Sequence, residues 1–148
     1  MDLEEKLYRE GFIPSSFSKR LYAYTIDELL ITLIIFAAFF NQFMAVAGDM
    51  MAIIALTNSM ILYFIFLKTA YHTIFIHLYG KTIGKMIARI RVIDIYTMDN
   101  PNLQTAFIRA IVRNLDEMLF YLGMLYALTN PFVQTLHDKI SKVVVIDD

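Results

Sequence analysis

Two long apolar runs dominate the first half of the chain. In the first run, every side chain from Leu29 to Phe40 is apolar except Thr32, and the run extends to roughly Leu21 and Met44. A helix of about 24 residues rises roughly 36 Å, which is enough to cross a bilayer core of about 30 Å. The first run therefore predicts a transmembrane helix.

The second run, Met50–Leu67, carries no charged side chain and continues more sparsely to Tyr79. It predicts a second transmembrane helix whose last turns reach the headgroup region. A third apolar stretch, residues 118–133, contains Asn130-Pro131. At about 16 residues and with a proline inside, it is short for a straight crossing.

Two short segments are predicted to be β-strands. Val-Ile-Asp occurs once in Arg91–Asp94 and again in Val143–Asp147, near the carboxyl end. Residues with branched β-carbons favour strands, and we expect the two segments to pair. Asp99-Asn-Pro-Asn102 is rich in turn-forming residues and precedes a helix that is expected to begin near Leu103.

Basic residues are placed asymmetrically about the two apolar runs. Lysines and arginines precede the first run and follow the second, whereas none lies between Asn41 and Leu67. By the positive-inside rule, the amino terminus and the loop over residues 79–108 are cytoplasmic, and the loop around Gly48-Asp49 faces out. We divide the chain into an N-terminal cytoplasmic segment, residues 1–16, and a transmembrane domain, residues 17–146.

Pairing of the two strands would place the carboxyl terminus in the cytoplasm, which conflicts with a third complete crossing. Residues 103–136 would then enter the membrane and return, as a re-entrant or bent helix shielded by the other spans. Three complete crossings are the alternative. The expected fold class is an all-α membrane protein with two to three transmembrane helices, a re-entrant or amphipathic helix and a short cytoplasmic strand pair.

Composition supports a membrane protein and excludes several classes of function. Hydrophobic residues make up 58% of the chain and the mean hydropathy is +0.56, more than a soluble domain of 148 residues can bury. A net charge of -1 gives no basis for nucleic-acid binding. The absence of cysteine excludes disulfides, thiol catalysis and cysteine-ligated metals. The first 20 residues contain no apolar run, so we do not expect a cleaved signal peptide.

One pattern of charged residues occurs twice: an arginine, six intervening residues, and then Asp-Glu. Offsets of seven and eight place the arginine and the two acids on one face of a helix. With each arginine at the cytoplasmic interface, the acids would lie roughly 10 Å into the membrane. The two copies are Arg20, Asp27 and Glu28 in the first run, and Arg109, Asp116 and Glu117 before the third.

Lys68 approaches the same depth from the second run. An unpaired charge at bilayer depth costs about 2.5–3.5 kcal/mol, so we expect these groups to face one another, with Lys68 as the counter-ion of Asp27. One interpretation is structural: the ion pairs lock the helices in register. The other is functional. Acids outnumber the nearest bases, Lys68 and Arg113, and a carboxylate left over is suited to carrying a proton or a small cation, with Asp27 and Asp116 as carriers.

The loop after the second run opens with Gly80-Lys-Thr-Ile-Gly-Lys. Lys81, Lys85 and Arg89 recur at every fourth residue, which predicts an interfacial helical turn whose bases contact anionic lipid headgroups. The glycine spacing differs from that of a phosphate-binding loop. His72 and His77 lie five residues apart and do not form a metal pair on one helix face; we interpret them as interfacial. We expect no metal and no cofactor.

Three segments together resemble the RDD family of prokaryotic membrane proteins. The first is Ser18-Lys-Arg-Leu-x-Ala-Tyr-x-x-Asp27. The second is Gly80-Lys-Thr-x-Gly-Lys-x5-Arg91-Val-Ile-Asp94, and the third is Leu136-His-Asp138 ahead of a valine-rich end. Their order and spacing cover residues 17–146, nearly the whole chain.

The family takes its name from an arginine at the start of its first helix and two aspartates. Arg20 and Asp27 match the first two positions, and we assign the second aspartate to Asp138, with Asp116 as the alternative. Glu28 is a departure, because an apolar residue is common at that position.

The resemblance implies the cytoplasmic (inner) membrane of a prokaryote, crossed more than once, and a transport-related role, since some members have been linked to sodium/proton exchange. We therefore expect a small integral membrane protein, not an enzyme, that handles protons or monovalent cations. Because two or three helices enclose little cavity, a homo-oligomer is expected. The alternative function is a non-catalytic membrane scaffold or partner-binding subunit.

Overall fold

The computed structural model describes residues 2–118, 128, 132, 134 and 136–148. These residues are mostly helical, with one two-stranded antiparallel sheet. The elements are α1 (Leu3–Glu10), α2 (Phe17–Ala38), α3 (Phe40–Ala45), α4 (Met50–Ser59), α5 (Ile61–Tyr79), α6 (Ile83–Ala88), β1 (Ile90–Asp94), α7 (Leu103–Met118), α9 (Leu136–Ser141) and β2 (Val143–Asp147).

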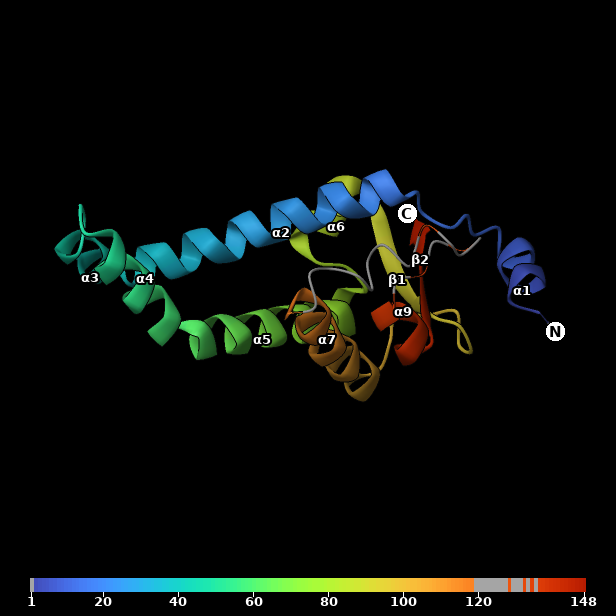
Figure 1. Ribbon diagram of the computed structural model, residues 1–148. Coiled ribbons are helices and arrows are strands. Elements are labelled where there is room, and N and C mark those ends of the chain that lie inside the picture. The colour runs from blue at the N-terminus through green and yellow to red at the C-terminus, as the bar shows by residue number, and fades with distance from the viewer. Residues whose placement is uncertain (1, 119–127, 129–131, 133, 135) are drawn as a thin grey trace.

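A long helical hairpin extends from the rest of the molecule. α2 forms one arm, α4 and α5 form the other, and α3 lies near the tip (Figure 1). α2 and α5 are each long and apolar enough to cross a membrane. Their apolar surface is largely uncovered: Leu33 and Phe66 are 63% and 75% exposed. Exposed apolar surface on this scale suits contact with lipid better than contact with water.

Both predicted spans are interrupted as helices. Phe39 separates α2 from α3, and Met60 separates α4 from α5. At the second break, the hydroxyls of Thr57 and Ser59 donate to the carbonyls of Ile53 and Leu56 at 2.9 and 2.6 Å. Such hydrogen bonds to the preceding turn bend helices. The first run gave no sign of its break, whereas the second break directly follows the polar residues Thr57-Asn58-Ser59.

The sheet confirms the predicted strand pair. β1 and β2 are antiparallel, with Ile90 opposite Asp147 and Asp94 opposite Val143. Because side chains alternate along a strand, the two faces of this sheet bury different neighbours. On one face, the core is formed by Val92, Val143 and Val145 with Ala23, Ile76, Ile90 and Ala106. On the other face, Ile93, Val144 and Ile146 pack against Leu7 of α1.

The two ends of the chain lie together at the sheet end of the hairpin (Figure 1). The amide of Ser15 donates to the carbonyl of Val145 at 2.9 Å, and the amide of Asp147 donates to the carbonyl of Ile13 at 2.8 Å. The segment before α2 therefore runs antiparallel beside β2. Both termini lie on the side where α5 ends.

α7 begins at Leu103, as the turn residues predicted. The Asn102 carboxamide oxygen accepts a hydrogen bond from the amide of Thr105 at 2.8 Å, which satisfies a free amide of the first turn. The third apolar stretch lies almost wholly outside the described residues. The choice between a re-entrant segment and a complete crossing falls there as well.

Candidate functional site

Charged side chains gather at the sheet end of the hairpin, where α2, α5, α6, α7 and α9 meet (Figure 1). Most are buried, and Asp27 and Asp138 are fully so. This charge network consists of Arg20, Asp27, Glu28, Lys68, Lys85, Arg109, Arg113, Asp116, Glu117 and Asp138. It contains five basic and five acidic side chains, so the expected excess of acids was wrong. That expectation counted only Lys68 and Arg113 as nearby bases.

Asp138 holds two arginines from different helices. Arg20 of α2 pairs with one carboxylate oxygen, and Arg109 of α7 donates to the other through Nε and Nη2 at 2.9 and 2.8 Å. The two arginines are 8% and 2% exposed. One carboxylate near the carboxyl end therefore ties α2 and α7 to α9.

Lys68 of α5 is paired with Glu28 at 2.8 Å and with Glu117 at 2.7 Å. The expected pairing of Lys68 with Asp27 was wrong. Both groups lie at similar depth, but depth does not fix the direction in which a side chain leaves its helix. Glu28 meets Lys68, whereas Asp27 meets Tyr71, about one turn further along α5. Arg113 of α7 joins the same group, with Nη2 3.4 Å from Glu28 and Nη1 3.6 Å from Glu117.

Arg113 also contacts two rings. Its guanidinium meets Nε2 of His72 and lies 4.8 Å from the centre of the Tyr24 ring. His72 is only 2% exposed, so it packs inside the protein. Its placement at the membrane interface stays a prediction. His72 lies on the face of α5 that contacts α7, and its side chain therefore points into the protein. His77 is half-buried, with Nδ1 3.2 Å from the carbonyl of Pro101.

Asp27 is bound by three uncharged donors. The Tyr71 hydroxyl and the Gly84 amide donate to Oδ1 at 2.7 and 2.8 Å, and the Thr82 hydroxyl donates to Oδ2 at 2.6 Å. Thr82 and Gly84 come from the Gly80–Lys85 loop, which the sequence placed at the membrane surface. The loop instead folds onto α2 and encloses the first aspartate.

Gly84 is essential to this arrangement. A Cβ added there would lie 2.7 Å from Oδ1 of Asp27 and closer still to the Ala23 carbonyl oxygen, too near for any side chain. Only glycine lets α6 approach α2 closely enough for its amide to reach the carboxylate.

Lys85 was expected to contact lipid headgroups, but it lies inside the charge network. It is 9% exposed, and among the described residues no carboxylate oxygen lies within 4 Å of its ammonium group. Burial lowers the pKa of Lys85 well below its usual range; nearby Arg109 lowers this pKa further, and the charge of Asp27 opposes both effects.

The spacing of Lys81, Lys85 and Arg89 predicted that one helical turn carries all three bases. This prediction was wrong, because α6 covers only Ile83–Ala88. Lys81 precedes the helix and pairs with Asp148. Arg89 follows it with a left-handed φ of 57°, and is exposed. The three bases therefore share no helix face. Contact of Lys81 and Arg89 with anionic headgroups stays a prediction.

No sequence pattern marks Tyr71 or Thr82, or gives the exact role of Gly84. Thr82 and Gly84 lay in a motif that was recognised, but the partner of a loop hydroxyl cannot be read from spacing. Tyr71 stands in an apolar helix where a tyrosine carries no distinct signal.

The structure gives Asp116 as buried, at 4% exposure.

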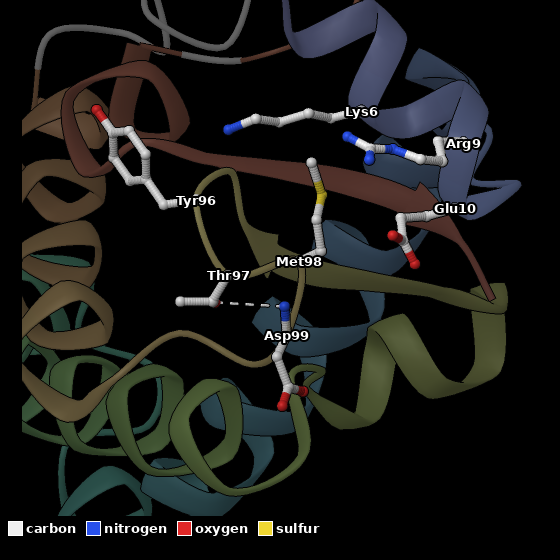
Figure 2. Close-up of a pocket in the computed structure, with 7 residues that line it drawn as sticks. All are labelled: Lys6, Arg9, Glu10, Tyr96, Thr97, Met98 and Asp99. Atoms are coloured by element: carbon white, nitrogen blue, oxygen red, sulfur yellow. Dashed lines mark hydrogen bonds between the residues drawn. The ribbon is translucent and has the colours of Figure 1, made fainter. Parts of the chain in front are cut away.

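A polar hollow of about 440 Å³ lies away from the network, between α1 and the turn after β1. Figure 2 shows Lys6 and Arg9 reaching into it from α1, with Lys6 directed toward Tyr96. The Lys6 ammonium donates to the carbonyl of Ile95 at 3.4 Å and lies 5.6 Å from the centre of the Tyr96 ring. These contacts fasten α1 to the turn.

Within the described ranges, no group of three or more acids and histidines is placed to hold a metal ion.

Comparison with known proteins gives the family. The model of the RDD family matches residues 14–142, which include every member of the charge network. The chain belongs to the RDD family. Family membership and the two apolar helices together indicate a small membrane protein. In this RDD protein, Arg20 and Asp138 are joined directly, whereas Asp27 is enclosed separately by the Gly80–Lys85 loop.

One curated relative is "Uncharacterized protein RP437" of Rickettsia prowazekii, which is 32% identical over 77 residues. The match covers 52% of this chain and 42% of that relative, so the RDD protein spans less than half of its length. No solved structure is significantly similar to the chain.

Proposed function

We propose that this RDD protein exchanges protons for small monovalent cations across the cytoplasmic membrane of a prokaryote, and is not an enzyme. The observation that carries the proposal is the enclosure of Asp27: a fully buried carboxylate, surrounded by two hydroxyls, next to the buried Lys85. Buried titratable groups in a membrane protein are common at ion and proton pathways.

The Asp27 enclosure can hold a proton or a cation. A hydroxyl is both a donor and an acceptor, so the Tyr71 and Thr82 hydroxyls can rotate and present lone pairs instead of hydrogens. Together with the carboxylate they would form a set of oxygen ligands, the kind that small hard cations prefer. A proton and a cation would compete for the same carboxylate.

Lys85 supplies electrostatic coupling. A cation bound at Asp27 would repel the Lys85 ammonium, whose pKa is already lowered by burial, and would favour release of its proton. Loss of the cation would favour return of the proton. Occupation of the two groups would thus be reciprocal, as an exchanger requires.

In this proposal, ions approach the network from the hairpin through a hollow of about 360 Å³. It is lined by Thr57, Ile61, Phe64, Ile65, Lys68, Asn114 and Glu117. Its polar end is the Lys68–Glu117 ion pair.

A membrane scaffold is the second candidate. It is favoured by the balance of five bases and five acids, because the ion pairs among Arg20, Arg109 and Asp138 and among Lys68, Glu28 and Glu117 join the helices. Purified protein in proteoliposomes that contain a pH-sensitive dye separates the two. On addition of sodium or potassium to one side, we expect a pH change that protein-free vesicles lack. Absence of any cation-dependent pH change would contradict the exchanger and leave the scaffold.

The proposed orientation places both termini in the cytoplasm. Basic residues flank the sheet end of the hairpin, and both ends of the chain lie there. A fluorescent-protein fusion after residue 148 should be bright, and an alkaline phosphatase fusion at the same point should be inactive. High phosphatase activity would show that the carboxyl end is outside.

A further inference from the structure

Asn58 is an exposed polar residue in the most apolar part of the hairpin. It lies in α4, nine residues after Asp49, within the uncharged run Met50–Leu67. Nine residues of helix rise about 13 Å, which is near the middle of a bilayer core of about 30 Å. The side chain of Asn58 would therefore face the centre of the membrane.

The neighbouring polar side chains are satisfied within their own helix, but Asn58 is not. Thr57 and Ser59 donate to backbone carbonyls of the preceding turn. In the part of the chain that the structure describes, the Asn58 carboxamide makes no hydrogen bond. A carboxamide has two donor hydrogens and an acceptor oxygen, and lipid tails satisfy none of them.

The same face of the helix carries exposed apolar side chains. Met51 and Ile54 precede Asn58 in α4 by seven and four residues, and Leu62 follows it by four, just past the break at Met60; they are 74%, 46% and 77% exposed. This spacing forms one stripe with the carboxamide near its centre. Among the residues that the structure describes, these exposed fractions leave the stripe uncovered.

We infer that this stripe is the surface through which two copies of the chain associate in the membrane, with the two Asn58 carboxamides hydrogen-bonded to each other. A second copy in the same orientation presents its own Asn58 at the same depth. A twofold axis brings like residues together, and two carboxamides are complementary because each donates and accepts.

The chain already uses such a bond between its own helices. The Asn114 carboxamide of α7 donates to the Thr69 hydroxyl of α5 at 2.7 Å. Interhelical bonds of this kind stabilise helix association where water is absent. The inference does not depend on ion exchange, because a scaffold could associate in the same way.

Cross-linking in proteoliposomes tests the inference. The chain has no cysteine, so single-cysteine variants have no background. Ile54→Cys places a thiol on the stripe, and Leu33→Cys places one on an exposed part of α2. With a short thiol cross-linker, we expect dimers of Ile54→Cys to exceed those of Leu33→Cys by at least about tenfold.

Adding Asn58→Leu to Ile54→Cys should reduce the dimer by about tenfold, the equivalent of roughly 1.4 kcal/mol. Asn58→Gln should keep part of the dimer, because it retains the carboxamide. Asn41→Leu removes an exposed carboxamide near the hairpin tip and should leave the dimer unchanged. Equal cross-linking of the two single-cysteine proteins, or an undiminished dimer in Asn58→Leu, would overturn the inference.

Discussion

Asp27→Asn is expected to abolish cation-dependent proton movement while leaving the protein folded and in the membrane. Asparagine matches the size of aspartate; its oxygen can accept hydrogen bonds from Tyr71 and Gly84, and its NH2 group can donate to the Thr82 hydroxyl. It cannot bind and release a proton, and it brings no negative charge to hold a cation. Both halves of the proposed exchange therefore fail. The measurement is the pH change in proteoliposomes on addition of sodium or potassium.

Three further variants sharpen the result. Asp27→Glu keeps the charge but places it one methylene further out, so part of the flux should survive with a shifted pH optimum. Asp147→Asn removes a carboxylate that pairs with Lys19 outside the network, and its flux should equal that of the wild type. Asp116→Asn removes a second buried carboxylate that could carry a proton, and we expect it also to lose flux. Wild-type flux in Asp27→Asn would rule out Asp27 as the carrier.

Asp138→Asn is expected to destabilise the protein by about 3–5 kcal/mol, the range for removing one partner of a buried ion pair. The variant leaves Arg20 and Arg109 buried close together without their shared carboxylate. The two positive charges then repel each other in surroundings of low dielectric constant. Thermal or denaturant unfolding of the protein in detergent micelles measures the change.

Surface and combined variants provide the controls for Asp138→Asn. Asp147→Asn breaks an exposed pair and should cost at most about 1 kcal/mol. A triple variant that combines Arg20→Met, Arg109→Met and Asp138→Leu should lose less stability than the sum of the three single changes, because no charge is left without a partner. Equal losses in Asp138→Asn and Asp147→Asn would show that the buried group contributes nothing special.

The sequence alone predicted the elements whose signals are local. The two apolar arms, the strand pair, the start of α7 and the family all follow from runs, repeats or motifs within a few residues of one another. These features depend on hydrophobicity and backbone preference, which neighbouring residues determine.

The tertiary structure alone decided how the charges pair. Lys68 meets Glu28 and Glu117 instead of Asp27, because the rotation of each helix about its axis selects among charges at one depth. Lys85 is buried because α6 folds back onto α2, an approach that Gly84 permits and that spacing along the chain does not reveal. The sequence thus determined which charged residues this protein brings to the membrane, and the packing of distant helices determined which of them touch.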